Sequence, residues 1–75
     1  MQVHVYTTQT CPYCFAAKNL LTEKGISFNE HDVSFNQAMR ASLMEKTGRR
    51  TVPQIFFDDH HIGGYVDLEK HFKNQ

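Results

Sequence analysis

Hydrophobic and polar positions alternate with different periods along the chain, and four segments have the pattern of a β-strand. Val3 and Val5 alternate with polar neighbours at period two, which is typical of a strand with one buried face. Ile26 and Phe28 indicate a second strand, although the residues that follow them are polar. The third segment has a proline near its start, which suits a first strand position, an edge or a special turn. The predicted strands are residues 2–6, 27–31, 52–57 and, after a turn at 58–60, residues 61–62.

The hydrophobic spacing changes to that of a helix after residue 10. Thr10 is a candidate cap, and the segment that follows has a broad hydrophobic face and ends at Gly25. This face consists of Phe15, Ala16, Ala17, Leu20 and Leu21. A last helix begins near Val66, after a tight turn of two glycines.

A further helix lies between the second and third strands. Ser34 and Gln37 fit a capping box, and Gly48 is a natural C-terminal stop. Its hydrophobic side chains recur every four residues at Phe35, Met39 and Leu43. The element order is therefore β-α-β-α-β-β-α, which predicts an α/β fold with one four-stranded mixed sheet flanked by three helices. The first two strands, joined by a helix, are expected to be parallel, and the last two to form a hairpin.

Composition excludes several functions. With 75 residues, the chain has room for one domain, residues 1–75. Eight Lys and Arg balance eight Asp and Glu, so no overall basic field would attract nucleic acid or an anionic membrane. The first ten residues lack the pattern of a signal peptide, and no stretch resembles a membrane span. We therefore expect a soluble cytoplasmic protein that binds neither nucleic acid nor membranes.

The two cysteines, Cys11 and Cys14, carry the clearest chemistry. A bridge between them would close a loop of about four residues and stabilise the fold by at most about 2 kcal/mol, so it is a poor crosslink. The pair lies where the first strand meets the first helix. Because first-turn amide groups favour a negative charge, Cys11 is the predicted thiolate nucleophile. Cys14, one turn further on, is the predicted resolving thiol that attacks the mixed disulfide of Cys11.

Two other interpretations of the cysteine pair compete with redox chemistry. A zinc site needs about four ligands, and the pair would supply two, with His60 and His61 as candidates for the others. Adjacent side chains in a hairpin point to opposite faces, which disfavours that site. The second alternative is a pair of inert buried thiols. The position at a strand-to-helix junction favours redox chemistry, with no bound metal.

Three motifs in order resemble the glutaredoxins, in particular the bacterial dithiol class with the sequence CPYC. They span residues 6–14, 51–56 and 61–68, so the resemblance covers nearly the whole chain. It implies a thioredoxin-like fold in a monomer that reduces protein disulfides and glutathione mixed disulfides. It further implies glutathione as co-substrate and electron donor, no tightly bound cofactor, and ribonucleotide reductase as a candidate electron acceptor.

The resemblance also implies a glutathione site. Pro53 matches the family's cis-proline, which leaves the Val52 backbone free to pair with an extended peptide. Gly64 would allow close approach of the ligand, and the helix start near Val66 would present free amide groups to the γ-glutamyl carboxylate. Val66 replaces the Asp, Ser or Thr found in many members, so any contact there comes from its backbone. Asp67 matches the acidic residue that receives the γ-glutamyl ammonium.

The remaining glutathione contacts implied by the resemblance lie at either side of these residues. Tyr13 would pack beside the tripeptide, and Thr51 precedes the pairing residue in the second motif. Arg49 or Arg50 would pair with the glycyl carboxylate, since a guanidinium suits that ion. Thr8 replaces a basic residue that many members carry three positions before the first cysteine, which removes one source of carboxylate binding.

Two rival functions have to be distinguished from a glutaredoxin. A thioredoxin-like donor would be reduced by a flavoprotein reductase instead of glutathione, and the Gly63-Gly64 turn and Asp67 argue against it. An iron–sulfur binding module would use Cys11 and glutathione from two chains to ligate a cluster, and Pro12 in the motif disfavours it.

Overall fold

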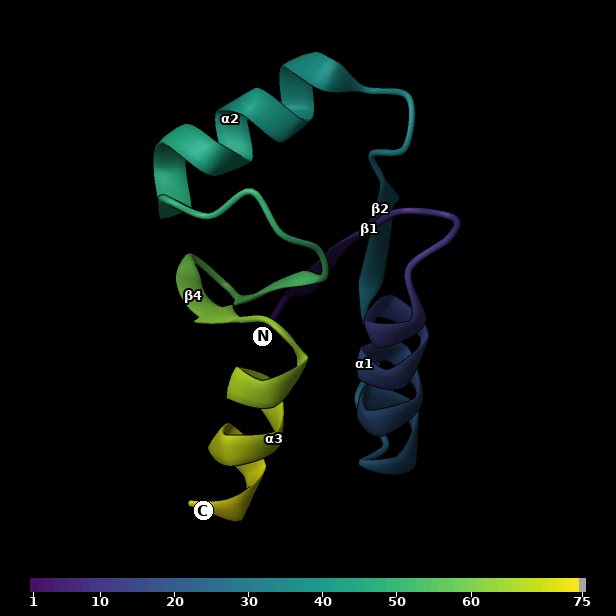
Figure 1. The fold of residues 1–75 in the computed structure, drawn as a ribbon. Coiled ribbons are helices and arrows are strands. Elements are labelled where there is room, and N and C mark those ends of the chain that lie inside the picture. Colours follow the sequence, from purple (N-terminus) through teal and green to yellow (C-terminus); the bar gives the residue numbers. More distant parts are fainter. Residues whose placement is uncertain (75) are drawn as a thin grey trace.

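The computed structural model describes residues 1–74 as four strands and three helices in the predicted order (Figure 1). The elements are β1 (Val3–Thr7), α1 (Pro12–Glu23), β2 (Asn29–Asp32), α2 (Gln37–Thr47), β3 (Gln54–Phe57), β4 (His60–Gly63) and α3 (Tyr65–Lys73). Gln75, the last residue of the predicted domain, lies outside the described residues. Among these helices, none combines the length and the apolar character that crossing a membrane requires.

The strands form one mixed sheet in the order β2-β1-β3-β4. β1 runs parallel to β2 and antiparallel to β3, and β3 and β4 form an antiparallel hairpin, which confirms the predicted α/β fold. The helices α1 and α3 lie on one face of the sheet, while α2 lies across the other (Figure 1). The N-terminal ends of α1 and α3 point towards the same region, near the chain that enters β3.

The hydrophobic core lies between the sheet and the pair α1 and α3. Its buried members are Val3, Val5, Ala17, Leu21, Ile55 and Leu68. Alternate residues of β1 and β3 supply it because successive side chains of a strand point to opposite faces. The buried stripe of α1 is narrower than the sequence predicts, since Phe15 at its start remains 55% exposed.

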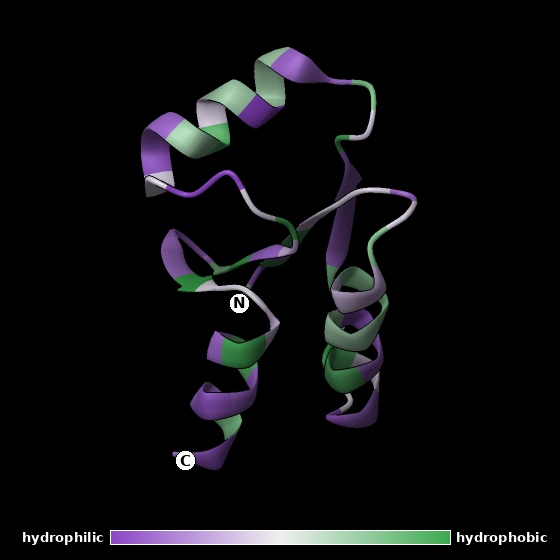
Figure 2. Cartoon of the chain, viewed as in Figure 1, coloured by the Kyte–Doolittle hydropathy of each residue, from purple (hydrophilic) through white to green (hydrophobic). Residues whose placement is uncertain are grey.

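The edge strand β2 begins two residues later than predicted. Its four residues are all polar, and only β1 pairs with it (Figure 2). Ile26 and Phe28 instead precede the strand and pack against the core from the connecting segment. An edge strand has one unpaired side and a largely solvated face, so it forms here without the hydrophobic alternation that predicts a strand.

The start of α2 differs from the predicted capping box. Asn36 is the N-cap, and its side-chain oxygen accepts a hydrogen bond from the Met39 amide at 3.0 Å. Ser34 lies in the preceding turn, where its hydroxyl accepts from the Gln9 amide at 2.8 Å. Asparagine is among the strongest N-cap residues, which explains why the helix starts at Gln37. The predicted C-terminal stop at Gly48 is confirmed, with a φ of +76°.

The later start leaves the predicted hydrophobic stripe of α2 largely unburied. Phe35 falls outside the helix and is 90% exposed. Met39 is also exposed, and Leu43 alone of the three predicted residues is buried. The helix therefore covers its face of the sheet through few side chains.

The observed bounds of β3, β4 and α3 also differ from those predicted from the sequence. Val52 and Pro53 precede β3 instead of belonging to it. β4 covers two more residues than the predicted pair, and α3 begins at Tyr65, one residue earlier than expected. The early helix start follows from Asp67, whose carboxylate accepts a hydrogen bond from the amide of the N-cap Gly64.

A ladder of aromatic rings crosses the sheet on the face that α2 covers. His31 of β2 stacks with Tyr6 of β1 at a centroid distance of 4.7 Å and hydrogen-bonds His4 between ring nitrogens 2.9 Å apart. The ladder continues from Tyr6 to Phe56 of β3 and from there to His61 of β4. Burial lowers the pKa of His31, and the nearby His4 lowers it further. Burial and then Arg49 lower the pKa of His61.

These two histidines should make the protein less stable in mild acid. Below the ordinary histidine pKa of 6.5, the unfolded chain takes up protons that the folded chain resists, so the free energy of unfolding falls as the pH drops. Each histidine contributes a slope of at most about 1.4 kcal/mol per pH unit. Urea unfolding between pH 7.5 and 5 measures the effect.

The matching control is His60, an exposed histidine of the same strand as His61, and its charge is the last of the causes that lower the pKa of His61. Replacing His31 and His61 together with glutamine should flatten the fall between pH 6.5 and 5, whereas replacing the exposed His60 should leave it in place. An unchanged slope in the double variant would show that other groups set the acid sensitivity.

Candidate active site

Cys11 is the residue immediately before α1, and it caps the helix itself. Its extended backbone, with φ −107° and ψ 107°, turns the sulfur back over the first turn, where Sγ accepts a hydrogen bond from the Cys14 amide at 3.2 Å. Thr10 therefore does not provide the cap. A sulfur in this position faces the free amide groups and the positive end of the helix. Cys11 is partly exposed and free, so it can reach a substrate.

Cys14 lies one turn further on and is buried, with 1% of its surface exposed. Burial, followed by its hydrogen bond with Cys11, raises the pKa of Cys14 to about 12. At neutral pH the buried residue is therefore a thiol. The two cysteines therefore differ in exposure, since Cys11 can meet a substrate and Cys14 is covered.

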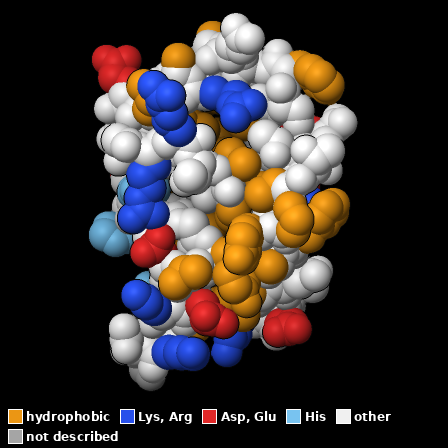
Figure 3. Space-filling view, in the orientation of Figure 1, with side chains coloured by type: hydrophobic (Ala, Val, Ile, Leu, Met, Phe, Trp, Pro, Cys, Tyr) orange, Lys and Arg blue, Asp and Glu red, His pale blue; other side chains and the backbone are white. Residues whose placement is uncertain are grey.

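A groove of about 260 Å³ opens beside the cysteines. The residues that line it come from the start of α1, the chain before β3 and the start of α3; they are Tyr13, Thr51, Val52, Pro53, Gly64, Tyr65, Val66 and Asp67. Figure 3 shows hydrophobic side chains gathered down the middle of the viewed face, between the starts of α1 and α3. The groove meets the cysteine pair at Val52, whose carbonyl oxygen lies 3.5 Å from Cys11 Sγ.

The Val52–Pro53 peptide bond is cis, which confirms the prediction made for Pro53. Seven of the eight predicted glutathione-binding residues line the groove, and Arg49 is the exception. Tyr65 also lines it, and sequence reasoning missed this residue. Its ring lies 6.1 Å from that of Tyr13, so the two tyrosines form adjacent parts of the wall. Tyr65 directly follows the Gly63-Gly64 turn, and this position in the sequence could have identified it as a groove residue.

Asp67 lies at the end of the groove and is held by two donors. Its Oδ2 atom accepts from the Gly64 amide at 3.0 Å and from Arg49 Nη1 at 2.8 Å. Arg49, followed by the Gly64 amide, holds the pKa of Asp67 below its ordinary value. Arg50 points elsewhere, with its Nε atom 3.1 Å from the sulfur of Met44. Of the two arginines proposed from the sequence, only Arg49 reaches a groove residue.

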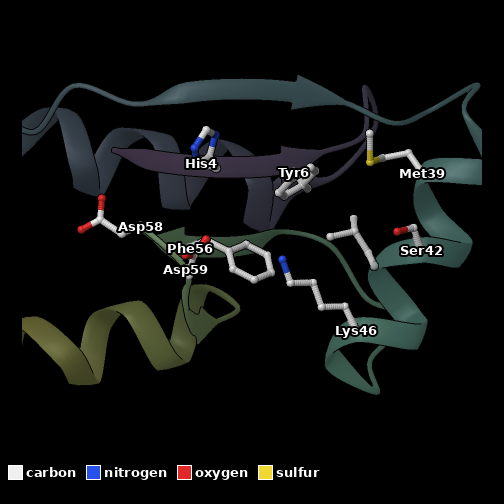
Figure 4. Close-up of a pocket in the computed structure, with 9 residues that line it drawn as sticks. His4, Tyr6, Met39, Ser42, Lys46, Phe56, Asp58 and Asp59 are labelled. Atoms are coloured by element: carbon white, nitrogen blue, oxygen red, sulfur yellow. The ribbon is translucent and has the colours of Figure 1, made fainter. Parts of the chain in front are cut away.

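Two of the hollows outside this groove border the sheet or the loop before Cys11. One, of about 360 Å³, borders the loop before Cys11 and is lined by Thr8, Gln9, Thr10, Ser34, Phe35 and Arg40. The other, of about 210 Å³, lies between α2 and the sheet, where Lys46 reaches towards the ring of Phe56 (Figure 4). Neither includes a cysteine. Across residues 1–74, no group of three or more His, Cys, Asp or Glu side chains is arranged to hold a metal ion.

An accessible sulfur at a helix N-terminus, backed by a buried second thiol and facing a cis-proline, can exchange electrons with a disulfide. The fold and the cysteine pair thus define a thiol–disulfide oxidoreductase. The family model described as Glutaredoxin matches residues 3–62. The chain therefore belongs to the glutaredoxin family, with the cysteine pair of its dithiol class.

Curated relatives support the same assignment. The chain is 53% identical over 66 residues to Glutaredoxin 3 of Escherichia coli (strain K12), which covers 88% of this chain and 80% of the relative. It is 47% identical over 66 residues to a glutaredoxin of Pseudomonas aeruginosa, covering 88% of this chain and 79% of that one.

Solved glutaredoxin structures share the fold. The solution structure of glutaredoxin from Brucella melitensis superposes with a TM-score of 0.87 at 44% identity, over 99% of this chain and 80% of the other. The crystal structure of a buckwheat glutaredoxin–glutathione complex superposes with a TM-score of 0.88 at 32% identity, over 96% of this chain and 69% of the other. The predicted thioredoxin-like fold is thereby confirmed.

Proposed function

We propose that this oxidoreductase depends on glutathione, which binds in the groove and supplies electrons for the reduction of protein disulfides and glutathionylated proteins. The observation that carries the proposal is the position of Cys11 Sγ, 3.5 Å from the Val52 carbonyl in the groove wall. A peptide that pairs with the Val52 backbone would bring its own sulfur to Cys11. The buckwheat relative, whose structure is described as a glutathione complex, supports this choice of peptide.

The tripeptide is proposed to lie extended along the groove. Its cysteine pairs with the backbone of Val52, held in place by the cis bond to Pro53. Its γ-glutamyl group lies over Gly64 and the backbone of Val66, and its ammonium contacts Asp67. The ring of Tyr13 flanks the peptide, and Thr51 forms the adjoining wall.

The proposed reaction conserves electrons through four thiol–disulfide exchanges. The Cys11 thiolate attacks one sulfur of a substrate disulfide, forms a mixed disulfide and releases the other half as a thiolate. Cys14 gives up its proton and attacks Cys11 Sγ, which releases the second half and closes the Cys11–Cys14 disulfide. Two glutathione molecules then reduce this disulfide and leave as one oxidised glutathione. A glutathionylated substrate needs only Cys11, because a second glutathione resolves the intermediate.

The proposal also covers the cellular location, the oligomeric state and the electron acceptor of the protein. A dithiol that must return to its reduced form suits the reducing cytoplasm, and we propose that location and a monomeric state. Ribonucleotide reductase is the proposed electron acceptor, as the resemblance to the glutaredoxins suggests. No tightly bound cofactor is required, since glutathione carries the electrons.

A coupled assay tests the dependence on glutathione. NADPH consumption is followed with a small disulfide in the presence of glutathione and glutathione reductase, and again with thioredoxin reductase in their place. The proposal expects turnover only in the first arrangement. Turnover only in the second would identify a thioredoxin-like donor and overturn the proposal.

A further inference from the structure

Two hollows near the active site share Arg40 as a lining residue. One is the hollow of about 360 Å³ at the loop before Cys11. The other, of about 250 Å³, lies on α2 and the chain that leaves it, and its lining residues are Arg40, Ala41, Met44 and Arg50. Because the hollows adjoin at Arg40, they form one surface, and we call the residues that line the two hollows the Arg40 surface.

The Arg40 surface adjoins both the nucleophile and the groove. Thr10 of the first hollow directly precedes Cys11, and Arg50 of the second directly precedes Thr51, which lines the groove. Figure 3 shows Lys and Arg side chains at the α2 end of the face that carries the hydrophobic stripe. A polypeptide whose sulfur reaches Cys11 would therefore meet this surface within a few residues of its disulfide, since each residue spans up to about 3.6 Å.

The two arginines of the Arg40 surface have no carboxylate partner within residues 1–74. Arg40 makes no side-chain hydrogen bond or ion pair there, and Arg50 Nε donates only to the sulfur of Met44 at 3.1 Å. No described Asp or Glu lines either hollow, and Asp32 is already engaged by the Ser34 amide at 2.9 Å. The whole chain has a formal charge of zero, so the Arg40 surface is a local excess of positive charge.

Hydrophobic side chains accompany these charges. Phe35, 90% exposed, lines the first hollow, and Met44, 38% exposed, lines the second. The neighbours of Phe35 fix its backbone, because Ser34 Oγ accepts from the Gln9 amide at 2.8 Å and Asn36 caps α2. Aromatic residues, methionine and arginine are enriched in protein interfaces, so this combination favours a docking surface over a merely solvated one.

We propose that the Arg40 surface binds an acidic segment of the disulfide-containing protein that this oxidoreductase reduces. Carboxylates of the segment would contact Arg40 and Arg50, and its hydrophobic side chains would pack on Phe35 and Met44. The occupant follows from charge complementarity, because such a segment supplies the negative charges that the two guanidinium groups lack. The inference rests on the class of thiol–disulfide oxidoreductases and does not depend on glutathione as the electron donor.

A single-turnover assay without glutathione tests the inference, with two peptides joined by a disulfide as the substrate. One peptide carries a fluorophore and the other a quencher, and the cysteine of the first is flanked on each side by two glutamates, two glutamines or two lysines. Cys11 attacks the disulfide and releases one peptide, and Cys14 attacks the mixed disulfide and releases the other. The dithiol of the protein is thus oxidised as the peptide disulfide is reduced. Each rate is divided by the rate with dithiothreitol, which corrects for the effect of the flanking charges on the disulfide itself.

The reduced protein should prefer the glutamate form over the glutamine form by about 3- to 10-fold, as expected for two exposed ion pairs. The lysine form should be the slowest. The preference should shrink at 1 M salt, where the screening length is about 3 Å. Replacing Arg40 and Arg50 together with glutamine should remove the preference.

The matched control replaces Lys24 and Lys73 together with glutamine, which removes the same charge from the far ends of α1 and α3. It should keep the preference, and thermal unfolding should confirm that both double variants are folded. The inference is overturned if both double variants lose the preference equally, since net charge would then explain it. Equal normalised rates for the three forms in the unaltered protein would also exclude an acidic partner.

Competitors distinguish an acidic polypeptide from other occupants. Octaglutamate should inhibit reduction of the glutamate form by the unaltered protein and not by the Arg40 and Arg50 variant. Stronger inhibition by octathymidylate would assign the surface to nucleic acid, and a preference that disappears as the protein concentration rises would assign it to a second copy of the chain. Either result overturns the inference. The proposed function fails separately, in the coupled assay with glutathione reductase.

Discussion

Replacing Cys11 with serine should abolish the reduction of glutathione mixed disulfides, with a loss on the order of 10³-fold or more. Cys11 Sγ is the accessible sulfur, placed on the amide groups of the first turn of α1 and 3.5 Å from the Val52 carbonyl. A serine hydroxyl at this position stays protonated and cannot replace a thiolate as the attacking group. The measurement is kcat/KM with a small glutathione mixed disulfide as substrate.

The matched variant is Cys14→Ser, which should keep activity of the same order towards that substrate and lose the reduction of protein disulfides that requires both thiols. Cys14 is buried, so a serine hydroxyl there can lack a partner and cost about 1–3 kcal/mol of stability. Cys14→Ala removes that complication, and the two variants should behave alike. Equal loss of activity in the Cys11 and Cys14 variants would contradict the division of roles.

The second large effect is expected at Gly63, where an added Cβ would collide with the side chain of Asp67. Its φ of +123° lies outside the regions open to other residues, and an added Cβ would overlap the Asp67 carboxylate. Gly63→Ala should therefore cost about 1–3 kcal/mol of backbone strain and should displace Asp67 from both Gly64 and Arg49. Urea unfolding measures the stability, and KM for a glutathione mixed disulfide measures the site.

Substitutions at two other glycines separate the cost of backbone strain from the cost of the collision between an added Cβ and Asp67. Gly25 has a φ of +71° with nothing within 4 Å of an added Cβ, so Gly25→Ala should cost about 1–2 kcal/mol and leave KM unchanged. Gly64 has an ordinary φ of −95°, and an added Cβ there would lie 3.5 Å from the Pro53 carbonyl oxygen, an ordinary van der Waals contact. Gly64→Ala should thus be the least destabilising of the three. A Gly63→Ala protein that binds glutathione normally would mean that the position of Asp67 does not matter.

Local patterns in the sequence predict those parts of the fold that depend on local chemistry. The alternation around Val3 and Val5 predicts β1, and Gly48 predicts the end of α2, because strand faces and left-handed turns leave direct signals. The start of α2 is harder, since Ser34 and Asn36 are both good caps and tertiary contacts choose between them. Ser34 is engaged by the Gln9 amide, 25 residues away, which leaves the cap to Asn36.

Contacts between distant parts of the chain also limit what the sequence predicts about the active site. The resemblance in the motifs identifies seven of the groove residues because the motifs are contiguous segments that the fold brings together. The partner of Arg49 could not be predicted in this way. Its ion pair with Asp67 joins residues from α2's exit and α3's first turn, and it depends on how Gln54 and Thr47 hold the connecting chain. No local pattern encodes that contact.

The proposed function requires that glutathione occupies the groove that Val52 shares with Cys11. The most direct test is the pattern of intermolecular nuclear Overhauser effects in the Cys14→Ser protein carrying glutathione on Cys11. We expect contacts from the glutathionyl group to Tyr13, Val52 and Val66 in the groove. Contacts confined to the hollow formed by the 8–10 loop and Phe35 would contradict it.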